Sequence, residues 1–147
     1  MIMRKRYTYA QFDTDVKKLA RALRPRTDRF DAIYGVPRGG LALAVCLSHS
    51  LGKPILLDPR RITKRTLVAD DIADSGATLK ALLKRQKVFL VVTLYRTTHS
   101  RMRPDFSCRT KKKNDWVVFP WETDASSAYD GTLKMRRPRA ARISRFP

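Results

Sequence analysis

The apolar positions near the start of the chain recur every three or four residues, at Phe12, Val16, Leu19, Ala20 and Leu23. This spacing places them on one face of a helix. Thr8, with Gln11 three residues later, forms a capping box in front of them, and Pro25 follows the last of them. The pattern therefore predicts an amphipathic helix over residues 9–24 whose apolar face packs against a core.

Two strand–helix–strand units follow this helix. Short apolar runs alternate with segments of helical spacing, which are, in chain order, 30–36, 41–51, 55–57, 67–69, 77–85 and 88–95. Gly52 ends the first of the two helical segments as a C-cap. Strands joined through a helix lie parallel, with a right-handed crossover. We therefore expect an α/β fold with an open, mainly parallel twisted sheet flanked by helices.

The pattern weakens after residue 95. Residues 96–114 read as a long loop with a short edge strand around Phe106, and 115–122 as a strand that carries two tryptophans. Burial in a core is the usual fate of tryptophan. Residues 125–147 show poor periodicity and many arginines, so we expect one folded domain over 1–124 and a basic tail over 125–147. The sequence leaves open whether that tail is a flexible appendage or contacts nucleic acid.

Two glycine-bearing turns come directly after strands of the two units. In parallel sheets such turns fall on one edge, where ligands bind. The first turn contains Pro37-Arg38-Gly39-Gly40 and opens a helix. It suits an anion held by backbone N–H groups, although a tight turn that needs glycine would read the same way. Both turns are expected to lie beside one another.

The second turn, 70–78, carries the densest chemistry in the chain. Three aspartates, Asp70, Asp71 and Asp74, fall within five positions and lead into a turn of small residues and a helix start. Amide groups and hydroxyls at a helix start suit a phosphate, whereas carboxylates suit sugar hydroxyls, a divalent cation or a proton. The stretch predicts a site for a phosphorylated sugar with Mg²⁺. An exposed acidic turn is the plainer alternative, and the helical DDxxD pattern of prenyl synthases fits poorly because Ser75-Gly76 would break that helix.

Charge narrows the choice of partners. The 147 residues include 32 Lys and Arg but only 13 Asp and Glu, a formal net charge of +19. The basic residues concentrate in the runs 4–6, 60–65, 111–113 and 134–145. Such a chain attracts polyanions, so nonspecific nucleic-acid binding at low salt is expected, as is attraction of small anions.

The composition also indicates where in the cell the protein is expected to be found. No apolar run approaches the roughly 20 residues of a membrane span, and the charged start has no apolar segment of a signal peptide. The two cysteines, Cys46 and Cys108, have no disulfide or metal-binding spacing. A cytoplasmic protein without a membrane partner is therefore expected.

The stretch 67–78 resembles the phosphoribosyl-pyrophosphate (PRPP) motif of type I phosphoribosyltransferases. That motif is an apolar strand, two acidic residues, two apolar residues, Asp, Thr or Ser, Gly, any residue and Thr, and it is complete here. The resemblance extends over about residues 7–124. It implies that Arg38, Gly39 and Gly40 bind pyrophosphate, with a cis peptide bond at Pro37-Arg38. It also implies a PRPP site formed by Asp70, Asp71, Asp74, Ser75, Gly76, Ala77 and Thr78.

The segment 115–122 resembles the corresponding segment of the 6-oxopurine (xanthine-guanine and hypoxanthine-guanine) phosphoribosyltransferases. The resemblance implies that Trp116 stacks on a purine and that the Val117 backbone reads the edge of its ring. Asp74 would accept the purine proton and act as the catalytic residue, and Arg96 stands next to the expected place of a purine-side lysine. Mg²⁺ would be held by the carboxylates of Asp71, Asp70 and Glu122.

The chain departs from that family in its cover over the substrate. The long flexible hood is reduced to about residues 58–65, and the usual Ser-Tyr pair is absent. The resemblance implies transfer of a phosphoribosyl group from PRPP to a purine, by a homodimer or homotetramer. The short hood and the net charge favour a second interpretation, a PRPP-responsive nucleic-acid-binding regulator with weak or no catalysis.

Overall fold

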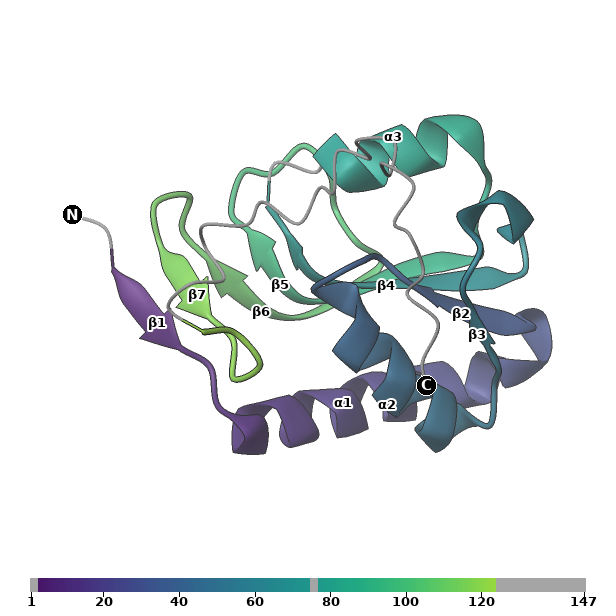
Figure 1. Ribbon diagram of the computed structural model, residues 1–147, viewed down its shortest axis with the longest axis horizontal. Coiled ribbons are helices and arrows are strands. Elements are labelled where there is room, and N and C mark those ends of the chain that lie inside the picture. The colour runs from purple at the N-terminus through teal and green to yellow at the C-terminus, as the bar shows by residue number, and fades with distance from the viewer. Residues whose placement is uncertain (1–2, 75–76, 124–147) are drawn as a thin grey trace, which may run out of the picture.

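The main sheet has five parallel strands in the order β3-β2-β4-β5-β6 (Figure 1). This computed structural model describes residues 3–74 and 77–123. The strands are β2 Ala32–Gly35, β3 Ile55–Leu56, β4 Thr66–Ala73, β5 Leu90–Thr97 and β6 Phe106–Lys111. The predicted α/β fold with an open parallel sheet is thus confirmed, including the edge strand near Phe106.

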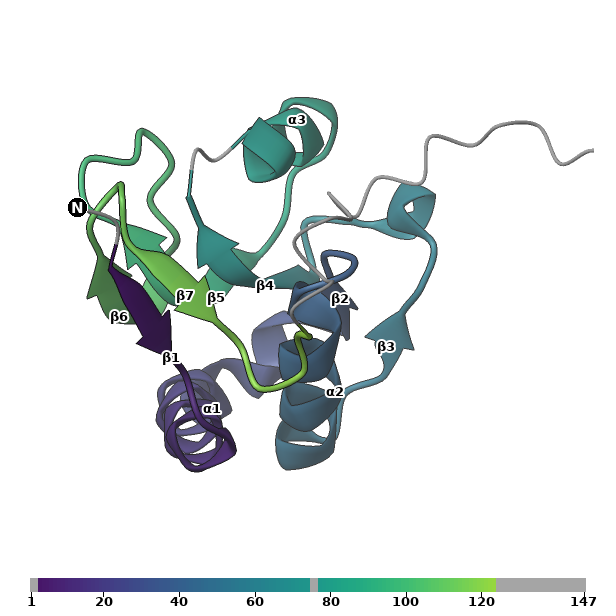
Figure 2. The ribbon, with the colours of Figure 1, turned by 60° about the vertical axis from the view of Figure 1, so that its left-hand side comes forward.

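Helices cover both faces of this sheet. Figures 1 and 2 show α1 (Tyr9–Leu23) and α2 (Gly40–Leu51) on one face and α3 (Ala77–Arg85) on the other. The larger core lies between the sheet, α1 and α2, and a smaller one lies under α3. Two short 3₁₀ helices, η1 (Arg24–Arg29) and η2 (Pro59–Arg61), lie in the connections.

The local signals in the helices behave as predicted. Thr8 Oγ1 accepts a hydrogen bond from the Gln11 N–H, and the Gln11 side chain accepts one from the Thr8 N–H, which completes the capping box. Gly52 ends α2 with φ of 63°, a left-handed conformation that glycine adopts without strain. The start of α1 and the end of α2 are therefore determined by interactions between residues close in the sequence.

The acidic turn begins later than the sequence suggests. Strand β4 continues through the first two aspartates to Ala73, because Asp70 pairs with Thr93 and Ile72 with Tyr95 of β5. The Asp70 side chain accepts a hydrogen bond from the Asp71 N–H at 2.8 Å. Pairing with a long central neighbour therefore outweighs the low strand propensity of aspartate.

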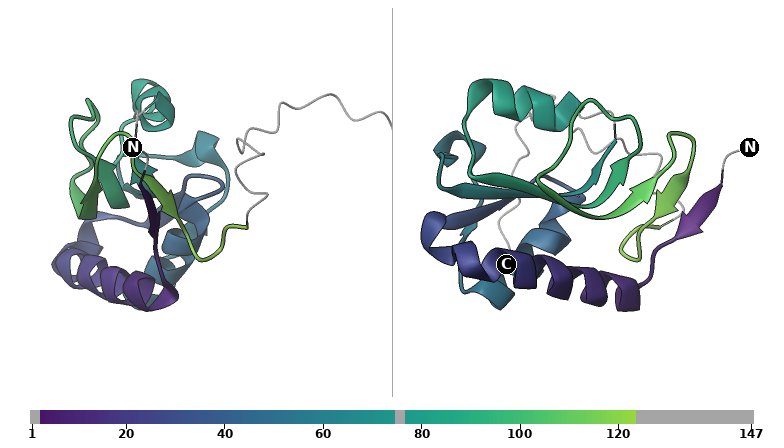
Figure 3. Two further views of the ribbon diagram at one scale, coloured as in Figure 1. Left: turned by 90° about the vertical axis from the view of Figure 1, so that its left-hand side faces the viewer. Right: turned by 180° about the vertical axis from the view of Figure 1, so that it is seen from behind.

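A second, two-stranded sheet was not predicted. β1 (Arg4–Arg6) pairs in parallel with β7 (Trp116–Val118), and Figure 3 shows the pair at the end of the molecule where α1 begins. The basic run 4–6 carries no apolar alternation, so its sequence gives no strand signal. Lys5 forms a 2.7 Å ion pair with the largely buried Asp115, which ties the two strands together.

The predicted short hood is confirmed. Only residues 57–65 separate β3 from β4, and they contain η2. Asp58 caps η2 by accepting a bond from the Arg60 N–H, while Arg65 pairs with Asp31. In the described part of the chain, no helix is long and apolar enough to cross a membrane.

A buried ion pair joins α1 to the edge strand. The Asp15 carboxylate is fully buried and lies 2.6 Å from Arg109 Nε and 2.7 Å from the Tyr7 hydroxyl, which donates to it. Burial, together with that hydrogen bond, raises the pKa of Tyr7. Because Asp15 lies between Tyr7 and β6, it fixes the chain entering α1 against the sheet.

Replacing Arg109 with methionine should therefore lower the free energy of unfolding by about 3 kcal/mol, since a buried carboxylate loses its cation. Lys17→Met is the matched control, because Lys17 pairs with Asp13 in full solvent and should cost less than about 1 kcal/mol. Urea unfolding followed by circular dichroism measures both. Equal losses would mean that the Asp15–Arg109 pair contributes no more than a surface pair.

Candidate active site

The two predicted turns meet at the carboxyl end of the sheet. The Val36 N–H donates to the Ala69 carbonyl at 2.9 Å, which places the first turn beside the end of β4. A Cβ added to Gly39 would overlap the Asp71 carboxylate, and one added to Gly40 would overlap the Ala69 carbonyl. Only glycine permits this approach. The expectation that both turns share one place is therefore confirmed.

The first turn presents the start of α2. The peptide bond between Pro37 and Arg38 is cis, as the resemblance implied. Gly39 is the N-cap residue and forms no side-chain cap, and the Gly40 N–H donates to the Val36 carbonyl. The Leu41 N–H likewise donates to the Arg38 carbonyl at 3.2 Å. The amino end of a helix nevertheless favours negative charge because of the helix dipole. The turn is thus suited to an anion.

A cleft of about 610 Å³ opens beside Asp71. Its wall combines the end of β4, the end of β6 and the β7 segment. The residues that line it include Asp71, Asp74, Lys111, Trp116 and Glu122. Trp116 is 48% exposed, whereas Trp121 stacks on Phe119 within the core. Trp116 therefore differs from an ordinary core tryptophan, and its ring is accessible from the cleft.

Asp74 is held by two partners from neighbouring strands. The Thr97 hydroxyl donates to Asp74 Oδ1 at 2.6 Å, and Lys111 Nζ lies 3.2 Å from the same oxygen. Lys111 is only 4% exposed and also donates to the Asp115 carbonyl at 3.1 Å. The cleft thus contains a carboxylate and an ammonium group side by side.

Lys111 is the residue that the sequence did not single out. It begins the run 111–113, which the charge pattern assigns to a solvated surface. Its burial depends on the register between β5 and β6, which places Lys111 opposite Thr97. Only that pairing distinguishes it from Lys112 and Lys113, which are exposed.

The two adjacent aspartates of β4 have different surroundings. Asp70 is 9% exposed, and burial raises the pKa of its carboxyl to about 8, with the negative charge of Asp71 adding to the shift. Burial also raises the pKa of Asp71, whose side chain borders the cleft. The site therefore holds two carboxyl groups that do not readily carry two negative charges together.

The expectation that Asp71, Asp70 and Glu122 hold Mg²⁺ stays a prediction. Among the described residues, no group of three acidic, histidine or cysteine side chains is arranged to bind a metal. Asp71 and Glu122 nevertheless line the same cleft, and the pKa of Glu122 is raised by burial and by the charge of Asp71. Two carboxylates suit Mg²⁺ that arrives with substrate phosphates, since this ion commonly takes one or two carboxylates and phosphate oxygens.

The remaining predicted residues divide into three sets. Ala77 and Thr78 form the exposed start of α3, and Val117 lines the cleft beside Trp116. Arg96 lies elsewhere, in the wall of a separate cavity at the end of β5. Ser75 and Gly76, like the tail from residue 124 onward, lie outside the described residues.

No protein-family model matches the chain. Solved structures do. Purine phosphoribosyltransferase from Pyrococcus horikoshii is 26% identical with a TM-score of 0.70, over 82% of this chain and 95% of that one. Xanthine-guanine-hypoxanthine phosphoribosyltransferase from Helicobacter pylori is 23% identical with a TM-score of 0.68, over 85% and 97%. A hypothetical protein from Neisseria gonorrhoeae with bound ppGpp is 22% identical with a TM-score of 0.67, over 86% and 94%.

The first two matches span nearly the full length of proteins that are named phosphoribosyltransferases, the family whose motif the chain resembles. The chain therefore has the type I phosphoribosyltransferase fold and, as its motif and tryptophan segment indicated, resembles the 6-oxopurine phosphoribosyltransferases.

Proposed function

We propose that this protein transfers the 5-phosphoribosyl group of PRPP to a ring nitrogen of guanine, xanthine or hypoxanthine, forming a nucleoside 5′-monophosphate and pyrophosphate. One observation carries the proposal. Asp71 borders both the glycine turn that suits pyrophosphate and the cleft that contains Trp116. A phosphorylated ribose at Asp71 would thus lie between an anion site and a surface for an aromatic base.

The reaction breaks the bond between ribose C1 and pyrophosphate and forms a bond from C1 to the purine nitrogen. Positive charge builds on the ribose as negative charge builds on the leaving pyrophosphate. Arg38 and the amide groups at the start of α2 would stabilise that negative charge, which is where preorganised donors contribute most. Asp70 and Asp71 would hold the ribose hydroxyls, and the start of α3 from Ala77 to Thr78, with Ser75 and Gly76, would hold the 5′-phosphate.

The base side of the cleft fits a purine that carries an oxygen at carbon 6. Stacking on an aromatic ring such as Trp116 contributes about 1–3 kcal/mol per base. Lys111 has a buried ammonium group that would donate to the 6-oxo oxygen, and Asp74 beside it would accept the proton from the ring. Arg96, which lines another cavity, is not needed for this assignment.

Mg²⁺ fits the proposal as a partner of PRPP. Asp71 and Glu122 would hold it, and bound there it would neutralise charge on the pyrophosphate. The protein's own residues would meanwhile orient the ribose and the base. Because the hood is short, we expect these orienting contacts to come from β4, β6 and β7 rather than from a closing loop.

A nucleic-acid-binding regulator that responds to PRPP is the second candidate. The net charge of +19 and the short connection over residues 57–65 favour it. A mobility-shift assay at physiological salt, with and without PRPP, separates the two proposals. Sequence-selective binding that PRPP changes would support the regulator, whereas binding that disappears above about 0.2 M salt reflects charge alone.

Asp74→Asn should lower kcat by about 100-fold or more, because the purine proton loses its acceptor, while the affinity for PRPP changes little. Pyrophosphate release measures kcat, and isothermal titration measures PRPP binding. Asp13→Asn, on the exposed face of α1, is the control and should leave both unchanged. Equal losses of turnover and of PRPP affinity would contradict the role given to Asp74.

Lys111→Met should lower kcat/KM for guanine and hypoxanthine by roughly 10- to 100-fold, as expected when a charged hydrogen bond to the substrate is lost. Activity with adenine, which offers no oxygen at carbon 6, should not fall in parallel. Pyrophosphate release with guanine, hypoxanthine, xanthine, adenine and uracil tests this, and Lys112→Met is the exposed neighbouring control. An equal decrease of kcat/KM for all five bases would mean that Lys111 does not select the base.

The free energy of unfolding should fall as the pH rises from about 5 to 8. The pKa of Asp70 is raised to about 8 in the folded protein, so the folded state keeps a proton that the unfolded state has already released. Asp70→Asn should reduce this slope. Asp31→Asn should keep it, because the pKa of Asp31 is lowered by its hydrogen bond to Arg65. Urea unfolding at several pH values measures the slopes, and an unchanged slope in Asp70→Asn would contradict the assignment.

A further inference from the structure

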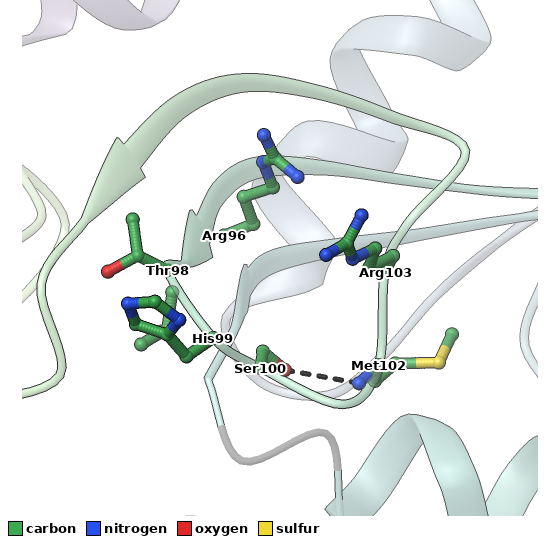
Figure 4. A pocket seen from close by; sticks show the side chains of 7 residues that line it. Arg96, Thr98, His99, Ser100, Met102 and Arg103 are labelled. Carbon is green, nitrogen blue, oxygen red and sulfur yellow. Dashed lines mark hydrogen bonds between the residues drawn. The ribbon is translucent and has the colours of Figure 1, made fainter.

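A second cavity, of about 230 Å³, lies in the loop between β5 and β6 (Figure 4). It is lined by Arg96, Thr97, Thr98, His99, Ser100, Met102 and Arg103. The proposed transfer reaction uses none of these side chains apart from the contact of Thr97 with Asp74. The cavity is smaller than the clefts of about 300–1,000 Å³ that hold drug-sized ligands, so its size suits a single small group.

The charge of this cavity is unbalanced. Figure 4 shows the guanidinium groups of Arg96 and Arg103 extending to the same side of the loop. Within residues 3–74 and 77–123, neither has a carboxylate at ion-pair distance, whereas Arg60, Arg65 and Arg109 each have one. Two like charges that line one cavity without a counter-charge favour an anion between them.

The loop that carries these groups is tied to the sheet at both ends. The Thr98 N–H donates to the Lys111 carbonyl at 2.9 Å, and the Asp105 N–H donates to the Val91 carbonyl at 2.8 Å. Between them, the Met102 N–H donates to Ser100 Oγ, and the Met102 side chain packs on the core under α3. The positions from which the two arginines extend are therefore fixed before any ligand arrives.

This cavity adjoins the cleft that contains Trp116, but the charged residues that line the two are different. Thr97 lines the cavity while its hydroxyl donates to Asp74, which lines the cleft. Arg96 and Arg103 line the cavity only, and Lys111 lines the cleft only. An anion in the cavity would therefore occupy a place distinct from the cleft that contains Trp116.

We propose that this cavity binds one phosphate group, as the free dianion or as a terminal phosphate monoester. Guanidinium groups match phosphate oxygens in bidentate geometry, and the residues Thr98, His99 and Ser100 belong to the lining of the same cavity. A polynucleotide backbone would present an extended row of charges instead of one compact dianion, and the small volume of the cavity favours the dianion.

Proton NMR of the imidazole groups tests the proposal directly, because the chain has two histidines. His99 lines the cavity, and His49 lies in the last turn of α2 and serves as the internal reference. Inorganic phosphate, titrated at constant pH and ionic strength, should shift the His99 signals to saturation and leave those of His49 in place. Neither PRPP nor a base is present, so the outcome is independent of the proposed transferase activity.

Two variants test whether an arginine that lines the cavity is responsible for phosphate binding. Arg103→Gln should weaken the apparent phosphate affinity at least tenfold. Arg101→Gln removes an equal charge from an exposed position of the same loop that does not line the cavity, and should change the affinity less than twofold. Equal effects of the two variants, or a shift of His99 that does not saturate, would overturn the proposal.

A titration with RNA distinguishes a single phosphate group from the phosphates of a polynucleotide backbone. A short single-stranded RNA without terminal phosphates is titrated under the same conditions. If it shifts His99 at concentrations where inorganic phosphate has no effect, the loop binds a polynucleotide backbone and the phosphate-group proposal is wrong. If inorganic phosphate and a 5′-phosphorylated mononucleotide act alike and the RNA does not, the proposal stands.

Discussion

The close approach of the glycine turn to the end of β4 is the contact on which the candidate site depends. Gly39 leaves room for the Asp71 carboxylate, and Gly40 leaves room for the Ala69 carbonyl. Because of that room, a helix start that favours anions lies against a pair of carboxyl groups. A Cβ at either glycine would overlap an atom of β4, so the helix start and the carboxyl groups could not approach this closely.

The opposite wall is fixed by polar contacts between strands. Thr97 from β5 and Lys111 from β6 both bond to Asp74 at the end of β4, so three neighbouring strands converge on one carboxylate. Lys111 reaches in addition to the Asp115 carbonyl, next to Trp116. This network connects the acidic end of the sheet to the segment that carries the exposed tryptophan, and it orients the groups that would meet a base.

Much of the fold is predictable from short-range signals. The capping box at Thr8, the left-handed Gly52 and the order of apolar runs determine the helices and the parallel sheet, and the motif at 67–78 locates the acidic half of the site. The remainder depends on pairing between distant segments. Strand β1 has no apolar alternation, and Lys111 resembles its two exposed neighbours until the register of β6 is known. Strand β1 and the burial of Lys111 depend on how distant strands pair, so they cannot be predicted from a local sequence pattern.

The parallel pairing of β1 with β7 has a consequence for the order in which the site can assemble during synthesis. The turn 37–40 and strand β4 both lie before residue 75, so both have been synthesised once about half of this chain has been made. The wall with Trp116 needs residues 4–6 together with residues 116–118, which are the first and last of the strands that the structure describes. In a nascent chain, the two turns that would bind phosphate are therefore synthesised well before the segment that would meet a base.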